Sequence, residues 1–402
     1  SFLLYSSFNY LIMKKKIAIL GSTGSIGENT LKIIKSDKKN FDVVLLSTNK
    51  NINKVLNQAK EFKVNNIIIS DLKSFQKAKL KNKSSKIKIF NNFDIFNKIF
   101  KKKNDLIMSS ITGLEGLTPT LKSIKHTKNI LIANKESIIC AWSLIKKELK
   151  KYKTNFIPVD SEHFSIWSLL ENNKTTNIDK IYITASGGPF LHLPENKFKN
   201  ISIKKALKHP NWKMGKKISI DSATLTNKLF EIIEAKNIFD IDYKKIFVLV
   251  HPDSYVHAII KFKNGLTKIL IHDTSMKIPI FNAMYFDDKN KQIPSRKIDL
   301  KKLNSLNLTK PNIKKFQALN ILKLLPNKSS LFETILISTN DEIVNLFLNK
   351  KISFDKIVPT ILKIIRSKNF VKYKRISPKN LNNITELSKI VRFKIKSMVY
   401  KI

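Results

Sequence analysis

The sequence predicts an α/β protein with a doubly wound parallel sheet in its N-terminal part, an α+β region after it and a helical C-terminal region. Three observations predict this fold class. Short β-type apolar runs alternate with helical stretches from Lys16 to about residue 150, as in parallel sheets. Three closely spaced glycines directly follow the first run. Helical periodicity dominates from about residue 313 onward.

The N-terminal elements follow from this alternation. Residues 17–20 predict a buried strand, and residues 28–35 predict the helix that follows it. Four further runs predict strands, at residues 43–46, 67–69, 106–109 and 130–132. The lysine-rich stretch 73–103 is weakly patterned, so the bounds of its elements stay open.

The second region predicts a mixed sheet, because its apolar runs are longer and its loops carry polar motifs. The strands are predicted at residues 181–184, 246–250, 256–262 and 266–271. Lys263-Asn264-Gly265 predicts a hairpin turn between the last two. A linker is predicted at residues 299–312, followed by helices that include residues 315–325 and 341–348.

The charge is extreme: 75 Lys and Arg face 30 Asp and Glu over 402 residues, a net charge of +45. One interpretation is binding to nucleic acid or to a membrane surface. The other is drift in composition, which we favour because the lysines are spread along the chain and only four residues are arginine. A protein selected to read bases would use the arginine fork. We therefore expect no specific nucleic acid partner.

Other compositional features concern the cellular location. No stretch reaches the roughly 18 uncharged apolar residues that span a bilayer, and the single cysteine, Cys140, excludes an internal disulfide. We therefore expect no membrane partner and a cytoplasmic location. Residues 1–12 precede Met13 and lack the basic start of a signal peptide. We interpret them as an extension before the natural start, the alternative being the remnant of a targeting segment.

The glycine cluster Gly21-Ser22-Thr23-Gly24-Ser25-Ile26-Gly27 lies between a predicted strand and a predicted helix. Glycines let the backbone approach a pyrophosphate, and the helix N-terminus favours its charge, so the segment predicts a dinucleotide site in a Rossmann-like domain. The second strand leads into Asn49-Lys50-Asn51, without the acid that binds the ribose of NADH. Lys50 favours NADPH, unless it is one more surface lysine.

Two acidic segments predict a metal site. Asp160 and Glu162 flank Ser161, and in an extended segment both carboxylates would point to the same side. Such oxygen ligands suit Mg²⁺ or Mn²⁺, whereas His163 is either a ligand or a packed neighbour. If residues 222–231 are helical, Asn227, Lys228 and Glu231 share a face, which provides phosphate donors and a third carboxylate, or else only a solvated ion pair.

Three further polar segments predict ligand contacts. Asn134-Lys135-Glu136 follows a strand, where ligands bind in open α/β sheets. Ser186-Gly187-Gly188 predicts an anion-binding turn. The segment from His209 to Gly215 contains Trp212 and Met214 and predicts a lid, the alternative being an ordinary surface loop.

In their order along the chain, GSTGSIG, ANKE, PVDSEH, SGGPF, HPNWKMG and DSATLTNKLFEIIEA resemble the motifs of the 1-deoxy-D-xylulose 5-phosphate reductoisomerase family. The resemblance is strong from Met13 to about residue 290. It implies NADPH- and divalent-metal-dependent rearrangement and reduction of 1-deoxy-D-xylulose 5-phosphate to 2-C-methyl-D-erythritol 4-phosphate, in non-mevalonate isoprenoid biosynthesis. It also implies a homodimer in the bacterial cytoplasm whose small-molecule partner is a sugar phosphate.

The resemblance assigns roles to matching residues. It implies that NADPH contacts Thr23, Gly24, Ser25, Ile26, Asn49, Lys50, Asn51, Asn134, Glu136 and Gly215. It implies one Mg²⁺ or Mn²⁺ held by Asp160, Glu162 and Glu231. It implies substrate binding by Lys135, Ser161, Glu162, Ser186, His209, Trp212, Met214, Ser222, Asn227, Lys228 and Glu231, with catalytic roles for Lys135, Glu162 and His209.

The domains implied are an NADPH-binding domain at residues 13–150, a catalytic metal and substrate domain at 151–298, the linker at 299–312 and a helical domain at 313–402. The sequence departs from the family pattern at Glu115, at residues 275–277 and at residues 338–342, where Asp341 replaces the usual asparagine. One alternative function is a non-catalytic, basic anion-binding protein on the same fold. Another is a semialdehyde dehydrogenase, which needs a nucleophilic cysteine and has only Cys140 available.

Overall fold

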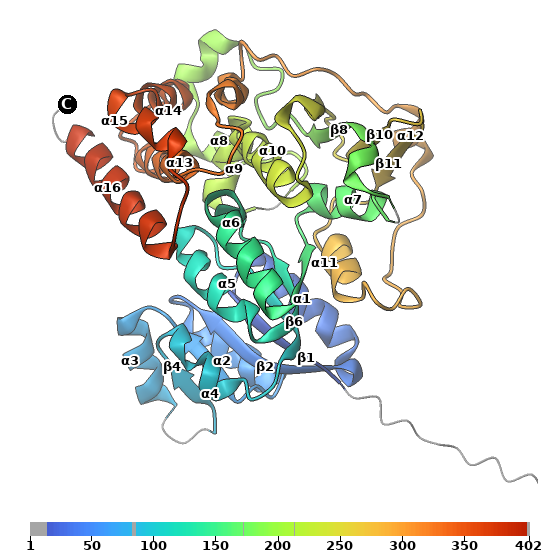
Figure 1. Cartoon of the computed structure of the whole chain (residues 1–402), viewed down its shortest axis with the longest axis vertical. Coiled ribbons are helices and arrows are strands. Elements are labelled where there is room, and N and C mark those ends of the chain that lie inside the picture. Colours follow the sequence, from blue (N-terminus) through green and yellow to red (C-terminus); the bar gives the residue numbers. More distant parts are fainter. Residues whose placement is uncertain (1–13, 83–85, 172, 213, 400–402) are drawn as a thin grey trace, which may run out of the picture.

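The computed structural model describes residues 14–82, 86–171, 173–212 and 214–399. The predicted extension at residues 1–12 lies outside this range. The described chain forms a lower α/β layer, an upper sheet with its helices, and a helical layer beside it (Figure 1). Within these residues, no helix is both long enough and apolar enough to cross a membrane.

The N-terminal sheet has seven parallel strands in the order β4-β3-β2-β1-β5-β6-β7. The order reverses at β1, so a crevice is expected at the carboxyl ends of β1 and β5, where such sheets bind ligands. The strands are β1 (Lys15–Leu20), β2 (Phe41–Thr48), β3 (Asn66–Ile69), β4 (Lys88–Phe90), β5 (Asn104–Ser109), β6 (Thr127–Ile132) and β7 (Asn155–Pro158).

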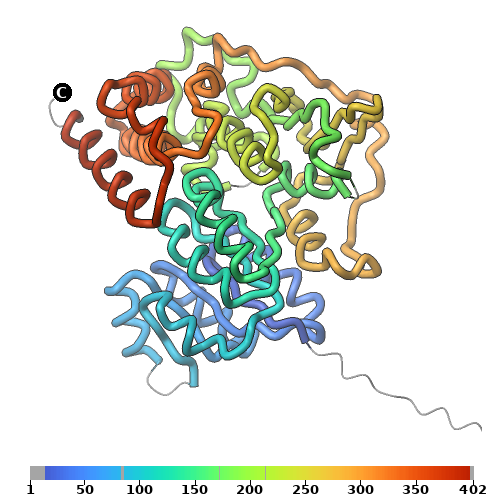
Figure 2. The backbone as a smooth tube through the Cα atoms, viewed as in Figure 1, coloured from blue at the N-terminus to red at the C-terminus, as the bar shows by residue number. Residues whose placement is uncertain are grey.

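Helices cover both faces of this sheet, and three apolar clusters lie between the sheet and its helices. The helices are α1 (Ser25–Ser36), α2 (Ile52–Glu61), α3 (Leu72–Lys81), α4 (Phe96–Ile99), α5 (Leu117–Ile124) and α6 (Lys135–Tyr152). One later helix, α11 (Lys277–Met284), returns to this layer and packs against α1; Figure 2 shows the chain coming back in orange.

The second sheet is mixed, as predicted, with the order β11-β10-β8-β9 and one parallel pair, β8 with β9. Its strands are β8 (Ile178–Ala185), β9 (Ile246–Val250), β10 (Val256–Phe262) and β11 (Thr267–Ile271). Gly265 lies between the antiparallel strands β10 and β11 with φ +89°, so the predicted hairpin turn is confirmed.

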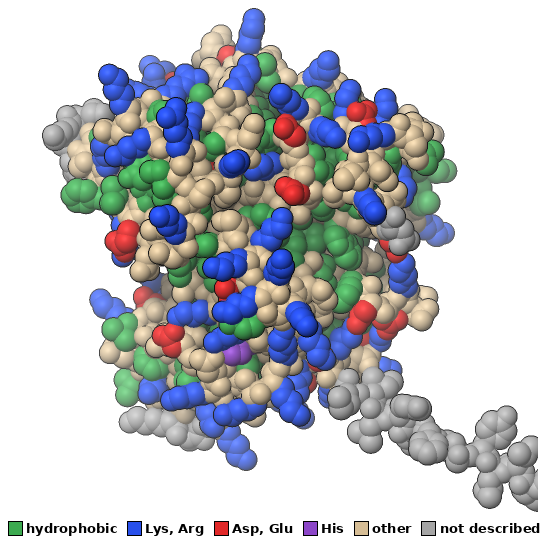
Figure 3. Space-filling view, viewed as in Figure 1, with side chains coloured by type: hydrophobic (Ala, Val, Ile, Leu, Met, Phe, Trp, Pro, Cys, Tyr) green, Lys and Arg blue, Asp and Glu red, His purple; other side chains and the backbone are tan. Residues whose placement is uncertain are grey.

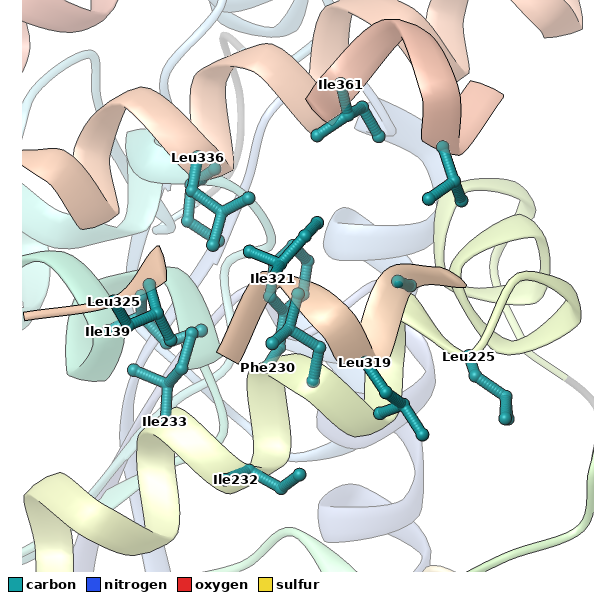
Figure 4. Packing of buried hydrophobic residues seen from close by; sticks show 14 of the residues in the cluster. Ile139, Leu225, Phe230, Ile232, Ile233, Leu319, Ile321, Leu325, Leu336 and Ile361 are labelled. Carbon is teal, nitrogen blue, oxygen red and sulfur yellow. The ribbon is translucent and has the colours of Figure 1, made fainter. Parts of the chain in front are cut away.

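The remaining helices surround a large apolar core that this sheet shares with the C-terminal layer. Phe230 and Ile233 enter it from α10 (Thr226–Phe239) and point toward Ile321 and Leu336, whereas Ile232 lies on the other side of that helix (Figure 4). The helices are α7 (Ser161–Leu169), α8 (Ile203–Ala206), α9 (Lys216–Ala223), α10 (Thr226–Phe239), α12 (Leu300–Asn304), α13 (Phe332–Leu348), α14 (Ile357–Ile365), α15 (Lys368–Val371) and α16 (Leu381–Val399).

Two sequence-based expectations differ from the structure, and two of the implied domain boundaries carry elements that the sequence did not predict. The extended segment expected around Ser161 is wrong: Asp160 is the N-cap of α7, and Glu162 lies in its first turn. Residues Gln317–Leu324 form a 3₁₀ helix where an α-helix was predicted. The predicted linker contains α12 and a bridge between Val250 and Thr309. In addition, β7 extends the first sheet beyond residue 150.

Candidate functional site

The glycine loop connects β1 to α1, and its backbone conformation requires glycine. Gly21 has φ +86°, a region that other residues rarely adopt. A Cβ on Gly27 would lie 2.5 Å from the Gly21 carbonyl oxygen, whereas one on Gly24 would meet nothing closer than 3.5 Å. The glycine loop therefore packs in backbone contact with the first turn of α1. The free N–H groups at the start of α1 can bind an anion.

A second turn reaches the same crevice from β6. Asn134 caps α6 by accepting from the Ser137 N–H at 2.7 Å, and its Nδ2 donates to the Ile111 carbonyl oxygen at 2.5 Å. Nδ2 also donates to Glu136 at 3.3 Å. The cap thereby fixes the direction in which Lys135 and Glu136 leave the helix.

Three carboxylates converge below this turn. Asp160, Glu162 and Glu231 each offer an oxygen, and these oxygens all lie within 4.8 Å of one another. The N-terminus of α7 supplies the first two, and α10 supplies Glu231. A second group, Asp160 with His163 and Glu234, meets the same distance limit. His163 Nε2 donates to the Glu231 carbonyl oxygen at 2.8 Å, which leaves its buried Nδ1 without a hydrogen-bond partner among the described residues.

Two lysines compensate part of this negative charge. Lys135 Nζ lies 3.3 Å from Asp160 and donates to Asn227 Oδ1 at 2.7 Å. Lys228 Nζ lies 2.7 Å from Glu162 and also pairs with Glu231. Burial disfavours the charged form of both lysines, but the surrounding carboxylates raise the pKa of each above its usual value.

The compensation is unequal among the carboxylates. Burial, and then the neighbouring Glu162, raise the pKa of Glu231 to about 8. Burial also opposes ionisation of Glu162, but Lys228 and hydrogen bonds such as that from Ser161 hold its pKa well below the usual range. Buried Glu234 likewise has its pKa raised to about 8. If Asp160 and these three acids were all ionised, two ammonium groups would leave two negative charges unbalanced.

Asn227, Lys228 and Glu231 share one face of α10, as the helical spacing predicts. Asn227 Nδ2 and Lys228 Nζ both donate to the Glu231 carboxylate. Lys228 and Glu231 are buried, so the alternative of a solvated surface pair is wrong.

A hydroxyl-rich corner lies at the end of β8. The ring nitrogen Nδ1 of His209 accepts from the N–H groups of Asn211 and Trp212 at 3.1 and 2.9 Å. Burial, and then Lys228, lower the pKa of His209 to about 4, so the neutral ring carries its proton on Nε2. That nitrogen lies 3.0 Å from Ser186 Oγ and donates to it, which leaves the Ser186 hydroxyl free to donate elsewhere.

The two glycines after Ser186 allow a close approach to α9. A Cβ on Gly188, which has φ +68°, would lie 3.0 Å from the Ser222 carbonyl oxygen. Ser186 and Ser222 therefore belong to two segments that are in backbone contact, and both line the same cavity.

The predicted lid segment lies over this corner. Asn211 Nδ2 donates to the Pro252 carbonyl oxygen at 2.6 Å and to Ser254 Oγ at 2.8 Å. The Trp212 ring packs edge-on against His257 at 6.2 Å between centroids. These contacts attach one end of the segment to the loop after β9 and to β10.

A cavity of about 660 Å³ joins these elements. The predicted residues that line it are Gly24, Ser25, Ile26, Asn134, Lys135, Glu136, Asp160, Ser161, Glu162, Ser186, His209, Trp212, Met214, Gly215, Ser222, Asn227, Lys228 and Glu231. The structure does not bring Thr23, Asn49, Lys50 or Asn51 to its wall. They lie beside it at the carboxyl edge of the sheet, where Thr23 Oγ1 hydrogen-bonds Thr48 Oγ1 at 2.7 Å.

Comparison with known proteins gives consistent matches along the chain. A family model described as "1-deoxy-D-xylulose 5-phosphate reductoisomerase" matches residues 17–142. Models of the family's C-terminal domains match residues 156–239 and 272–394. A reductoisomerase of this name from Pelagibacter ubique is 58% identical over 386 residues, which cover 96% of this chain and 99% of the relative. The chain belongs to the 1-deoxy-D-xylulose 5-phosphate reductoisomerase family.

Other reductoisomerases support this membership. The relative from Clostridium tetani is 38% identical over 94% of this chain and 97% of its own length. A solved reductoisomerase from Zymomonas mobilis in complex with NADPH is 28% identical, with a TM-score of 0.85 over 97% of this chain and all of its own. Another, in complex with NADPH, fosmidomycin and magnesium, is 30% identical, with a TM-score of 0.88 over 96% and 98%. The predicted family, fold class and enzyme class are confirmed.

Cys140 is not placed to act as a nucleophile. The residue is fully buried in α6, and burial raises the pKa of its thiol well above the usual value. Cys140 is absent from the cavity wall, so the semialdehyde dehydrogenase alternative is wrong.

Sequence reasoning missed several charged and aromatic residues of the cavity wall. His257 and Lys217 line it, as do Asp341 of α13 and Arg392 of α16. Asp341 lies in the run 338–342 that departs from the family pattern, but the sequence does not connect that run with the cavity. The other three lie in no recognisable motif, because Lys217 is one of many lysines and His257 and Arg392 come from segments distant in the chain. The departure at Asp341 and the fact that Arg392 is one of only four arginines are the available signals.

Proposed function

We propose that this chain catalyses the rearrangement and NADPH-dependent reduction of 1-deoxy-D-xylulose 5-phosphate to 2-C-methyl-D-erythritol 4-phosphate with Mg²⁺ or Mn²⁺, as a step of non-mevalonate isoprenoid biosynthesis. The observation that carries the proposal is the cluster of Asp160, Glu162 and Glu231 in a cavity that also borders the glycine loop. It places a metal-type donor set beside a dinucleotide-type turn, in a chain of this family.

The donor set fits a hard divalent cation. Asp160, Glu162 and Glu231 are oxygen donors, and together with buried Glu234 they lack two positive charges when fully ionised beside Lys135 and Lys228. Such a cation, when bound, supplies Lewis acidity to carbonyl and hydroxyl oxygens. We therefore assign the metal to these three residues and treat His163 as a residue that orients Glu231 through its backbone.

The substrate phosphate is assigned to the hydroxyl-rich corner. Ser186, Ser222, Asn227 and Lys228 line the cavity around it, and His209 orders the Ser186 hydroxyl so that its proton points to an acceptor. This arrangement supplies donors to an anion without adding a histidine charge.

Lys135, Ser161 and Glu162 are assigned to the carbon end of the substrate. Lys135 keeps its ammonium charged because carboxylates surround it, and it offers donors to substrate oxygens at the carboxylate cluster. Ser161 Oγ donates to Glu162 at 2.6 Å, which orients that carboxylate. Trp212 and Met214 cover the cavity and exclude water.

NADPH is assigned to the glycine loop and its surroundings. Gly24, Ser25 and Ile26 present the start of α1, while Asn134, Glu136 and Gly215 line the adjoining wall. Asn49, Lys50 and Asn51 follow β2 beside Thr23, where Lys50 can meet a 2′-phosphate. NADPH supplies the hydride.

We also propose the domain division at residues 13–150, 151–298, 299–312 and 313–402, and a homodimer in the bacterial cytoplasm.

Support for a dimer comes from the outer face of the second sheet, where a cross-strand apolar row is formed by Phe247, Tyr182, Ile259 and Ile269. Phe247 and Ile269 are 39% and 44% exposed. Analytical ultracentrifugation measures the mass of the particle in solution and so tests whether the chain forms a dimer.

The deciding experiment follows the loss of reduced-nicotinamide absorbance with 1-deoxy-D-xylulose 5-phosphate, NADPH and either cation. We expect turnover that chelation of the metal abolishes. Absence of turnover in a folded, metal-loaded sample would contradict the proposal. Binding of NADPH or phosphate without turnover would instead support a non-catalytic, anion-binding protein.

A further inference from the structure

A charged cluster in the wall of the cavity, in which only Glu136 has been assigned a ligand, connects three parts of the molecule at Lys217. Its Nζ lies 2.9 Å from Asp221 on the same helix, 3.4 Å from Glu136 at the start of α6 and 3.1 Å from Asp341 of α13. The opposite oxygen of Asp341 accepts from Arg392 of α16 at 2.7 Å. One ammonium thus contacts carboxylates from the cofactor side, from the phosphate-binding helix and from the C-terminal layer.

The Lys217 side chain is 31% exposed to the cavity, but the carboxylates that it meets are largely buried, so its interactions differ from those of a surface ion pair. Asp221 is 1% exposed and Glu136 is 7% exposed. The Lys217 ammonium also lies 5.1 Å from the centre of the buried Phe230 ring. Burial opposes the charge of Lys217, but Asp221, Asp341 and Glu136 raise its pKa well above the usual lysine value. Removing one partner here would leave uncompensated buried charge.

The position of α9 explains why this cluster matters. Gly215 of the lid is the N-cap of α9, and Lys217 lies in its first turn. Asp221, which Lys217 and Asn340 both hold, directly precedes Ser222. The Ser222 carbonyl contacts Gly188 of the turn that carries Ser186. A shift of α9 would therefore move both serines of the phosphate corner.

We propose that Lys217 is a positioning residue, which fixes the phosphate-binding end of α9 against α6 on the cofactor side and against α13 and α16 of the C-terminal layer. The role rests on the proposed function, because it concerns how firmly the phosphate is held. Lys217 acts through Asp221 and Asp341 and touches no reacting atom. The C-terminal helices thereby contribute to substrate affinity without supplying a substrate ligand.

The test compares Lys217→Met with Lys217→Arg. Methionine keeps the apolar stem over Phe230 but removes the charge, whereas arginine keeps a charge that can reach the same carboxylates. We expect Lys217→Met to raise the substrate KM about ten- to a hundredfold and to change kcat much less. Lys217→Arg should recover a large part of the affinity. The matched control is Lys389→Met, which removes an exposed lysine of α16 that pairs only with Glu386 in the described structure.

Two further variants test the connection to the C-terminal layer. Asp341→Leu removes both the anion shared by Lys217 and Arg392 and its hydrogen-bonding oxygens, and should raise the KM in the same direction. Arg392→Met should add less to Lys217→Met than it does to the parent chain, because both act through Asp341. A lowered thermal midpoint with an unchanged KM would reduce Lys217 to a purely structural role and overturn the proposal.

Hydrogen exchange separates this inference from the proposed function. Lys217→Met should speed backbone exchange in residues 216–223, while Lys389→Met should not. The measurement needs no turnover, so an inactive parent chain would contradict the proposed activity and leave the exchange result to decide on the anchoring of α9. Equal exchange in the two variants would overturn the anchoring.

Discussion

Glu231 is the most constrained residue of the site. It is 2% exposed, and its carboxylate contacts Asn227 and Lys228 of its own helix while facing Glu162 across the cavity. Burial, and then the neighbouring Glu162, disfavour its ionised form and raise its pKa to about 8. A residue in this environment contributes little to stability as an anion, but it is well suited to bind a cation.

Replacing Glu231 with glutamine tests this role. Glu231→Gln keeps the volume and the hydrogen-bonding reach but removes the third anionic ligand. We expect turnover to fall about a hundredfold or more, with NADPH affinity close to that of the parent chain. Steady-state kinetics and NADPH fluorescence titration measure the two effects.

The control is Glu386→Gln, at an exposed position of α16, which should leave both quantities unchanged. Near-normal turnover of Glu231→Gln would remove the residue from the metal site. Loss of NADPH binding together with turnover would point to a wider structural defect.

At the scale of elements, the turn between β1 and α1 depends on backbone contact. Gly27→Ala places a methyl group 2.5 Å from the Gly21 carbonyl oxygen and from Ser22 Cα, and neither atom belongs to a flexible side chain. We expect a loss of about 1 to 3 kcal/mol in the free energy of unfolding and weaker NADPH binding. Urea denaturation and fluorescence titration check both.

Gly24→Ala is the matched variant. Its methyl group would meet only the Gly21 carbonyl oxygen at 3.5 Å, and Gly24 has an ordinary φ of −84°. The free energy of unfolding should stay within about 0.5 kcal/mol, while NADPH binding weakens because the methyl group would point toward the assigned cofactor. Equal destabilisation by both substitutions would contradict this account of the turn.

His126 connects α5 to β6 and gives that connection a dependence on pH. Its ring packs between Phe96 and Phe100, with centroids 6.0 and 5.4 Å away. Burial, and then Lys125, lower its pKa from 6.5 to about 4. Between these values the unfolded chain binds a proton that the folded chain does not, so stability is lost as the pH falls through this window.

We expect this histidine to account for about 1 to 2 kcal/mol of the free energy of unfolding lost between pH 7 and pH 5. His126→Phe, which keeps an aromatic ring in the cluster, should make the dependence on pH shallower without abolishing it, since His209 and His257 also have lowered pKa values. Urea denaturation at the two pH values measures the slope. Exposed His192 provides the control, and an unchanged slope in His126→Phe would contradict the assignment.

The sequence predicted elements well where local chemistry decides them. The glycine loop, the helical face of Asn227, Lys228 and Glu231, and the hairpin at Gly265 all follow from spacing and residue type. An extended segment at Asp160 is the wrong prediction, because the preference of aspartate for a helix N-cap outweighs the alternating positions of Asp160 and Glu162. With Glu162 in the first turn, that preference was the available signal for a helix.

Other features depend on contacts between distant segments. Residues 155–158 form a strand because β6 offers an open edge, not because the short run is distinctive. In the sequence, Lys217 cannot be distinguished from the many surface lysines. Only the fold places Glu136 and Asp341 beside it, and Arg392 on the other side of Asp341. In a chain so rich in lysine, pairing of charges over long sequence distances cannot be derived from local pattern.

At the scale of the whole molecule, the net charge of +45 is distributed widely. Figure 3 shows lysine and arginine side chains over the whole visible face, with acidic side chains scattered among them. Several of the 30 acids are used in the buried cavity, so the outer surface is still more positive. The positive side chains of such a surface repel one another in the compact state, and the acidic side chains are too few to offset most of this repulsion.

We therefore expect salt to stabilise the folded chain. Raising the ionic strength from about 0.01 M to about 0.15 M shortens the screening length from about 30 Å to about 8 Å, which suppresses repulsion across the molecule. The same salt weakens exposed ion pairs, but each contributes only about 0.2 to 1 kcal/mol. The thermal unfolding midpoint should rise, as measured by circular dichroism.

Screening must be distinguished from anion binding in the phosphate corner. Sodium fluoride and sodium chloride should raise the midpoint equally at equal ionic strength, because screening depends on charge and not on the identity of a monovalent anion. Sulfate should add a further increase, since it can bind near Ser186, Ser222 and Lys228. Lys228→Met should remove that extra increase, although the loss of the buried partner of Glu162 and Glu231 will also lower the midpoint in every salt. A midpoint that falls with sodium chloride would mean that attraction, not repulsion, dominates the surface.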